Sequence, residues 1–152
     1  AENATTTSLS SSIASVMTRS AGTPFANWAT DNNIDPPTNT SDFDGDSITD
    51  LQEYLFATDP AEPGSFSEAF EFEVTSDGFL ASVRQSLAPG VTFDYIGSTD
   101  LIFGEAALDE GASIGQYRVL ATERFGSFQE RLIEVNTTGM PRFFLRVRAE
   151  MP

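Results

Sequence analysis

The chain of 152 residues has no cysteine, no histidine and no lysine, so all eight of its basic residues are arginines. Without Cys and His, the sequence excludes a Ser-His-Asp triad, a cysteine nucleophile and a zinc site of thiolate or imidazole ligands. Without Lys, it excludes Schiff-base chemistry. A hydrolase that uses two carboxylates stays formally open, but no pair of acids stands out from the rest. We therefore predict that the protein is not an enzyme.

Positive charge is scarce as well, because 8 arginines face 23 acids and give a net charge of −15. Nucleic acid and anionic membranes both need a basic face, so we expect neither as a partner. No apolar run approaches the roughly 20 residues of a membrane span, and we expect no membrane insertion. The first residue is Ala1 rather than Met. We interpret the chain as a processed product or a fragment, and we expect a secreted, extracellular or cell-surface location.

The acidity is concentrated between Ser20 and Val83, a stretch with 13 of the 23 acids and no basic residue. So many carboxylates repel one another unless cations neutralise them or salt screens them. A solvated acidic face and a metal site are the two interpretations of such a stretch.

Oxygen-bearing side chains recur at regular spacing within this stretch, in the run DFDGDSITDLQE that begins at Asp42. Counted from Asp42, carboxylates occupy positions 1, 3, 5, 9 and 12, and the residue at position 7 can offer a backbone carbonyl. A Glu at position 12 can bind through both oxygens, which favours Ca²⁺ over Mg²⁺. Ser47 stands at position 6, where the EF-hand loop has Gly. The predicted calcium ligands are Asp42, Asp44, Asp46, Ile48, Asp50 and Glu53.

Two segments precede the β-rich part of the chain. Residues 1–23 are rich in Ser and Thr, and apolar residues at helical spacing predict a helix there. A flexible tail, or an extended arm that pairs with a neighbouring subunit, are the alternatives. Residues 24–62 form a helical segment with the calcium loop. Phe25, Trp28 and Ala29 have helical spacing, and Trp28 is predicted to be core; a second helix follows the loop and ends before Asp59-Pro60.

Residues 66–152 show a period of two, broken by turn signals such as Asp77-Gly78 and Pro89-Gly90. The pattern predicts six or seven short strands in an antiparallel β-sandwich, so the fold class is mainly β (α+β). Tyr95, Tyr117 and Phe144 are expected to pack in its core. We expect the arginines near or on the last strand, Arg142, Arg146 and Arg148, to face water or to pair with strand carboxylates. Examples of such carboxylates are Glu71, Glu73 and Glu134.

The run DFDGDSITDLQEYLFATDP resembles the calcium repeats of the thrombospondin type 3 and dockerin-like kind, especially the single-copy form DxDGDGLxNxxEYxxGTDP of secreted bacterial proteins. There the repeat commonly follows a Trp-containing helix and precedes a β-domain that ends in an aromatic-Arg strand, an order also found here. Ser47, Asp50 and Ala57 depart from the pattern, where the repeat has Gly, Asn and Gly. The resemblance implies a calcium-stabilised structural or adhesive module at the cell exterior.

Two functions follow from these features. The first is a secreted calcium-binding structural protein that self-associates into a homopolymer, as a subunit of a filament, a surface layer or a matrix. The alternative is a calcium-stabilised β-sandwich module that binds a carbohydrate or a surface protein.

Overall fold

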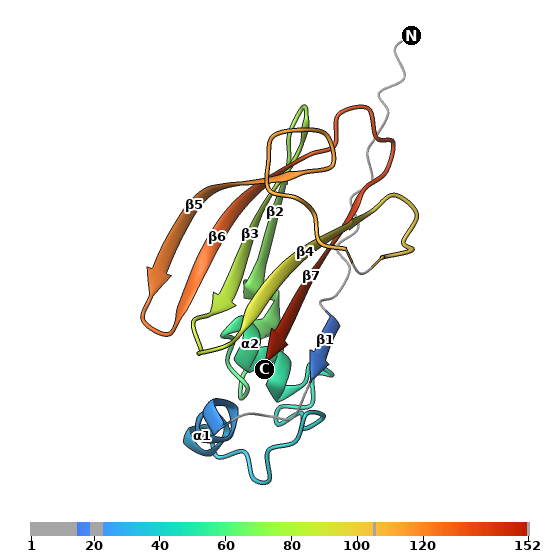
Figure 1. Cartoon of the computed structure of the whole chain (residues 1–152). Helices are drawn as coiled ribbons and strands as arrows, with labels where there is room; N and C mark the ends of the chain where they lie inside the picture. Colours follow the sequence, from blue (N-terminus) through green and yellow to red (C-terminus); the bar gives the residue numbers. More distant parts are fainter. Residues whose placement is uncertain (1–14, 19–22, 105, 152) are drawn as a thin grey trace.

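Two β-sheets and two short helices make up most of the chain that the computed structural model describes, namely residues 15–18, 23–104 and 106–151 (Figure 1). One sheet has the strand order β1-β7-β4 and the other β2-β3-β6-β5. The strands are β1 (Ser15–Thr18), β2 (Phe70–Val74), β3 (Gly78–Ser86), β4 (Thr92–Ser98), β5 (Tyr117–Phe125), β6 (Phe128–Asn136) and β7 (Phe144–Met151). The helices are α1 (Thr23–Asp31), α2 (Asp50–Phe56) and the 3₁₀-helix η1 (Ser65–Ala69).

The four-stranded sheet is antiparallel throughout, and β4 also pairs antiparallel with β7. β1 differs, because it pairs parallel with β7 and places Ser15 opposite Arg148. The predicted strand runs and the mainly β, sandwich-like fold are therefore confirmed. The prediction of a helix near the N-terminus is wrong for residues 15–18, where β7 offers a free strand edge whose backbone groups β1 pairs with. The rest of that predicted helix lies outside the described residues.

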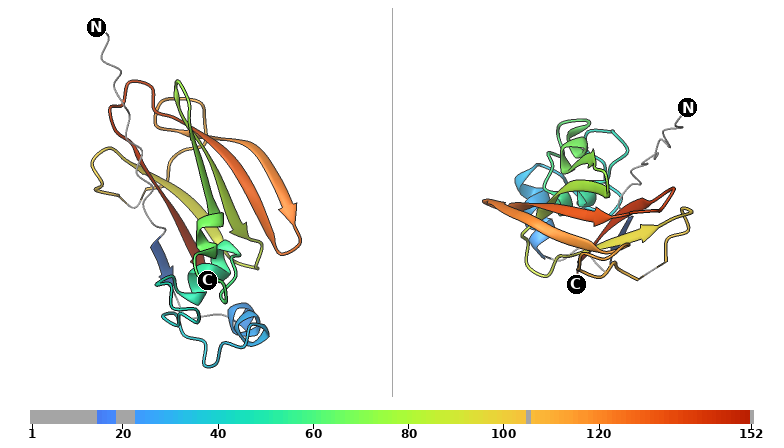
Figure 2. Two further views of the ribbon diagram at one scale, coloured as in Figure 1. Left: turned by 180° about the vertical axis from the view of Figure 1, so that it is seen from behind. Right: turned by 90° about the horizontal axis from the view of Figure 1, so that it is seen from above.

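The core forms where the inner faces of the two sheets meet (Figure 2). Alternate residues of β3 and β7 are buried, as period-two sequences require when one face of each strand is covered. Phe79 of β3 contacts Phe143, which directly precedes β7, at a ring-centroid distance of 6.0 Å. Tyr95 is buried, whereas Tyr117 and Phe144 are half-buried.

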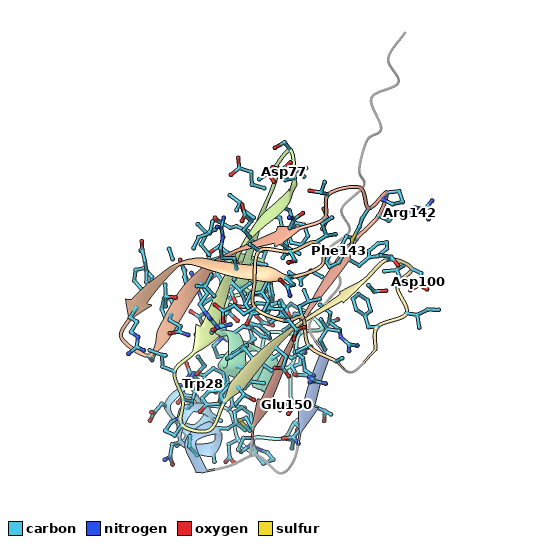
Figure 3. The ribbon with its side chains drawn as sticks, turned by 45° about the horizontal axis from the view of Figure 1, so that its top comes forward. Trp28, Asp77, Asp100, Arg142, Phe143 and Glu150 are labelled. Atoms are coloured by element: carbon cyan, nitrogen blue, oxygen red, sulfur yellow. The ribbon has the colours of Figure 1, made fainter. Side chains whose placement is uncertain are left out.

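The helices close one end of the sandwich, and they share its hydrophobic cluster. Leu51, Leu55 and Phe56 bury one face of α2, and the ring of Phe56 lies 5.5 Å from that of Phe93 on β4. α1 packs beside α2, and Phe25 is fully buried. Trp28, predicted to be core, is only half-buried and packs against the edge of the hydrophobic cluster. Figure 3 shows Trp28 at this end of the molecule and Asp77, on the β2–β3 turn, at the opposite end. α2 therefore ties the loop before it to the β-sandwich.

In the β7 region, Arg148 pairs with strand carboxylates as predicted, but not with the acids that the sequence suggested as examples. Arg148 pairs with Asp94 on the neighbouring strand at 2.6 Å and with Glu150 at 3.3 Å. The guanidinium of Arg146 lies 5.0 Å from the ring centroid of Phe103. The predicted partners Glu71, Glu73 and Glu134 belong to β2 and β6, in the other sheet, and Arg118 pairs with Glu134 instead. Arg142 is exposed, as expected.

Within the described residues, no helix is both long and apolar enough to cross a membrane.

Candidate metal centre

The loop before α2 brings three carboxylates together. One oxygen from each of Asp42, Asp44 and Asp46 lies within 4.8 Å of the other two. Backbone N–H groups of the loop hold these side chains: Asp42 accepts from Gly45 at 2.8 Å and from Ser47 at 3.0 Å, and Asp44 accepts from Asp46 at 3.1 Å. The carboxylates converge because each one turns back onto the backbone that follows it.

The first turn of α2 supplies the two other predicted carboxylate ligands. Thr49 caps the helix, and the side chain of Gln52 accepts from the backbone N–H of Thr49, which forms a capping box. The cap places Asp50 and Glu53 in the first turn, where both residues are fully buried. Asp50 Oδ1 accepts from the N–H of Phe43 at 2.9 Å and so ties the helix to the start of the loop.

Three of these carboxylates keep one buried oxygen without a hydrogen-bond partner among the described residues. The oxygens are Asp44 Oδ2, Asp50 Oδ2 and Glu53 Oε2. A buried carboxylate oxygen with no partner is costly, because water no longer solvates its charge. All three come from residues that the sequence predicts as metal ligands, so the donor set fits a cation.

Burial and mutual repulsion shift the pKa values of two of these carboxylates. Burial, and then the charges of Asp44 and Asp46, raise the pKa of Glu53 to about 8, while a hydrogen bond from Ser65 acts in the opposite direction. Burial also raises the pKa of Asp44, with further increases from Asp46 and Asp42. Without a cation the site therefore favours a proton, and a divalent ion would replace that proton and offset the repulsion.

Two residues that the sequence analysis missed complete the surroundings of the site. The N–H of Gly64 donates to Asp46 Oδ2 at 2.9 Å, and the hydroxyl of Ser65 lies 3.3 Å from Glu53 Oε1. The pair Pro63-Gly64 is a turn signal, but a local pattern does not say that the turn folds back onto the loop. The segment after α2 is thus held to two of the predicted ligands.

The calcium repeat that the loop resembles has glycine at two positions where this chain has Ser47 and Ala57. Both residues nevertheless adopt the backbone conformation that glycine favours. Ser47 has φ +75° and Ala57, which caps the C-terminus of α2, has φ +53°. This left-handed region costs an ordinary residue about 1–2 kcal/mol. The chain keeps the turn and the helix end despite both replacements.

The arrangement as a whole can hold a metal ion on Asp42, Asp44 and Asp46. Asp50 and Glu53 lie outside that group of three, although both are buried beside the loop. Ile48 donates its N–H to Asp46 Oδ1 at 2.8 Å, and its role as a carbonyl ligand stays a prediction. Oxygen donors alone suit a hard divalent cation.

Comparison with known proteins finds no matching family model, no matching curated protein and no matching solved structure. The metal centre is therefore supported by its own geometry.

Proposed function

We propose that the protein is a calcium-binding structural protein of the cell exterior, in which the ion fixes the helical end to the β-sandwich. The observation that carries the proposal is the set of three buried carboxylate oxygens of Asp44, Asp50 and Glu53 that lack partners among the described residues. A cation is the simplest group that neutralises all three.

Calcium suits this donor set better than magnesium. Ca²⁺ takes six to eight oxygen ligands in a flexible geometry, whereas Mg²⁺ demands a small octahedron. The loop and the first turn of α2 offer five carboxylates, and Glu53 stands where a bidentate ligand belongs. The resemblance to thrombospondin type 3 and dockerin-like repeats supports the same ion and an extracellular setting.

A structural role follows from the place of α2 in the fold. Asp50 and Glu53 lie on the helix that buries Leu51, Leu55 and Phe56 in the core. An ion bound by these carboxylates would therefore stabilise the packing of α2, because binding to the folded state alone adds its free energy to folding.

Two edge strands support a role as an assembly subunit. β2 and β5 end the four-stranded sheet, and an unpaired edge is a template for another strand. Both carry exposed apolar side chains: Phe72 and Val74 on β2, and Leu120 and Phe125 on β5. We therefore extend the proposal to self-association in a homopolymer, as in a filament, a surface layer or a matrix.

Calcium titration by isothermal calorimetry tests the metal centre. We expect one bound ion per chain, and no binding after the combined substitution Asp46→Ala and Glu53→Ala. The matched control removes two exposed acids elsewhere, Asp77→Ala with Glu123→Ala, and should leave binding intact. Unchanged binding in the first variant would contradict the proposed site.

Light scattering and electron microscopy test the assembly. Ordered polymers in millimolar calcium that dissociate in chelator are the expected result. A monomer in both conditions would contradict self-association and favour a binding module.

A further inference from the structure

A groove of about 370 Å³ lies between the helical end and two turns of the four-stranded sheet. Trp28 of α1 and Tyr54 of α2 line one side, with Thr58 just after α2. Ser86 at the end of β3, and Ser127 and Phe128 at the β5–β6 turn, line the other. The predicted metal ligands are not among the described lining residues. The groove is therefore a separate feature of the surface, and the inference below does not depend on the metal.

Aromatic rings form the walls of the groove, and each ring packs against a neighbouring side chain. The ring centroids of Trp28 and Tyr54 are 5.3 Å apart, and Phe128 stacks on Phe125 at 5.2 Å. The guanidinium of Arg84 lies 4.8 Å from the centroid of Phe128. Such contacts fix the orientation of the rings, so the groove is largely preformed.

Polar groups on the same residues have unused hydrogen-bonding capacity. Within the described chain, the hydroxyl of Tyr54 and the indole N–H of Trp28 have no hydrogen-bond partner. Thr58 Oγ1 also lacks one, but this atom is buried and offers the ligand no contact. Ser86 Oγ accepts from the N–H of Ala88 at 3.2 Å, and its own proton is left for another acceptor. Unpaired hydroxyl and indole groups beside aromatic walls are suited to a ligand that has both apolar and hydroxyl-bearing surface.

The charge of the lining residues and of the whole protein limits the class of ligand further. None of the described lining residues is ionised at neutral pH, although the chain has a net charge of −15. A cationic ligand would find no carboxylate in this lining, and an anionic ligand would be repelled by the protein as a whole. A neutral ligand remains.

We infer that this groove binds a neutral sugar, with an apolar ring face against Trp28, Tyr54 or Phe128 and ring hydroxyls on the unpaired polar groups. Its volume is near the lower end of the range for ligand pockets, which suits a short oligosaccharide or the end of a longer chain. The inference goes beyond the structural role proposed above, because it assigns a partner to a second site.

Trp28 is the only tryptophan of the chain, so its fluorescence reports directly on the groove. The experiment titrates the protein in millimolar calcium with cellotriose, maltotriose, xylotriose and N,N′,N″-triacetylchitotriose, and with trigalacturonate as an anionic comparison. We expect a saturable change with at least one neutral sugar and binding at least roughly tenfold weaker for trigalacturonate. The absence of saturable binding by fluorescence and by calorimetry with every neutral sugar would overturn the inference, as would equal binding of the anion.

Three variants locate the binding. Ser127→Tyr fills the mouth of the groove from an exposed turn and should weaken binding roughly tenfold or more. Tyr54→Phe keeps the ring and removes one hydroxyl, and should weaken binding by about threefold to tenfold. The matched control Ser113→Tyr adds the same side chain at a distant exposed turn and should bind as the unmodified protein does. Unchanged affinity in Ser127→Tyr, with the fold verified by thermal unfolding, would overturn the assignment.

Discussion

The β-sandwich and the loop before α2 differ in whether their buried polar side chains have hydrogen-bond partners. In the sandwich, Gln85 is 1% exposed, donates to the Tyr95 hydroxyl at 3.0 Å and accepts from Gln129 at 3.0 Å. In the loop and first turn of α2, three buried carboxylate oxygens have no partner among the described residues. The sandwich thus satisfies the buried side chain of Gln85 with groups of its own chain. At the helical end, these three oxygens have no partner within the described residues, which is what the proposed cation site requires.

Arg146 is the described exception within the sandwich, because its buried Nε lacks a hydrogen-bond partner there. Its guanidinium nevertheless lies over the ring of Phe103 and donates to the carbonyl of Gly104 at 3.5 Å. An arginine keeps several other donors when one is unused, whereas a carboxylate oxygen without a partner leaves negative charge unbalanced. The contrast between the two regions therefore lies in charge as well as in hydrogen bonding.

Calcium removal should have the largest effect on stability, because the proposed ion fixes the helical end to the core that it shares with the β-sandwich. At a calcium concentration a thousandfold above Kd, binding contributes about 4 kcal/mol. For a chain of this size we expect chelation to lower Tm by roughly 10 °C. Scanning calorimetry in millimolar calcium and in chelator measures the difference, and the Asp46→Ala, Glu53→Ala variant should show none. Equal Tm values for the unmodified protein would contradict the prediction.

A substitution in the sandwich should destabilise the protein whether or not calcium is present. A Cβ at Gly78 would collide with the carbonyl oxygen of Val135 on β6, so Gly78→Ala should cost about 2–3 kcal/mol. Gly104→Ala is the control, because a Cβ there meets nothing within 4 Å. Urea unfolding should give the same loss in calcium and in chelator. A loss confined to the chelated protein would contradict the prediction that the cost of Gly78→Ala does not depend on calcium.

The free energy of unfolding of the metal-free protein should depend on pH through the buried carboxylate of Glu53. The pKa of Glu53 is raised from 4.5 to about 8, so the folded chain retains a proton that the unfolded chain releases. Stability from this group is complete below about pH 4.5 and is lost as pH rises through about 8, with a slope of up to about 1.4 kcal/mol per pH unit. Glu53→Gln should reduce that slope in urea unfolding between pH 5 and 8. Identical slopes in the two proteins would contradict the assignment.

The smallest effect is expected at the strained turn of the loop. Ser47→Gly relieves a positive φ but adds freedom to the unfolded chain, so the net gain should be about 0.5–1 kcal/mol. Calcium affinity should improve by a few fold. Gly45→Ala, at φ +79°, is the matched change in the opposite direction and should weaken binding. Tighter binding in both variants would rule out strain as the cause.

Local patterns in the sequence predicted α1, α2, the strand runs and the convergence of Asp42, Asp44 and Asp46. These features depend on spacing within about a dozen residues, where helix, strand and loop geometry are regular. Ser47 stands where the EF-hand loop has Gly, and the structure gives this residue the left-handed backbone that glycine favours.

Contacts between residues far apart in the chain could not be predicted from the sequence. The apolar residues around Val16 suit a helix by spacing, but residues 15–18 lie extended beside β7. The partners of Arg148 depend on which strands share a sheet, which no local period encodes. The hydrogen bonds from Gly64 and Ser65 to the predicted ligands depend on the path of the segment after α2. Each error concerns residues that meet only after the chain has folded.

The central position of β7 has a consequence for the order of folding. β7 lies between β1 and β4, and both neighbours precede it in the chain (Figure 1). The pairing of β7 with β1 or β4 closes a long loop of intervening chain. Such pairing is slow, because the chain loses the conformational entropy of the loop before the contacts between the strands compensate for it. During synthesis the loop, the β2–β3 hairpin and the β5–β6 hairpin can form early from local contacts. The three-stranded sheet must wait for residues 144–151, so β1 and β4 cannot pair with β7 until those residues have been made.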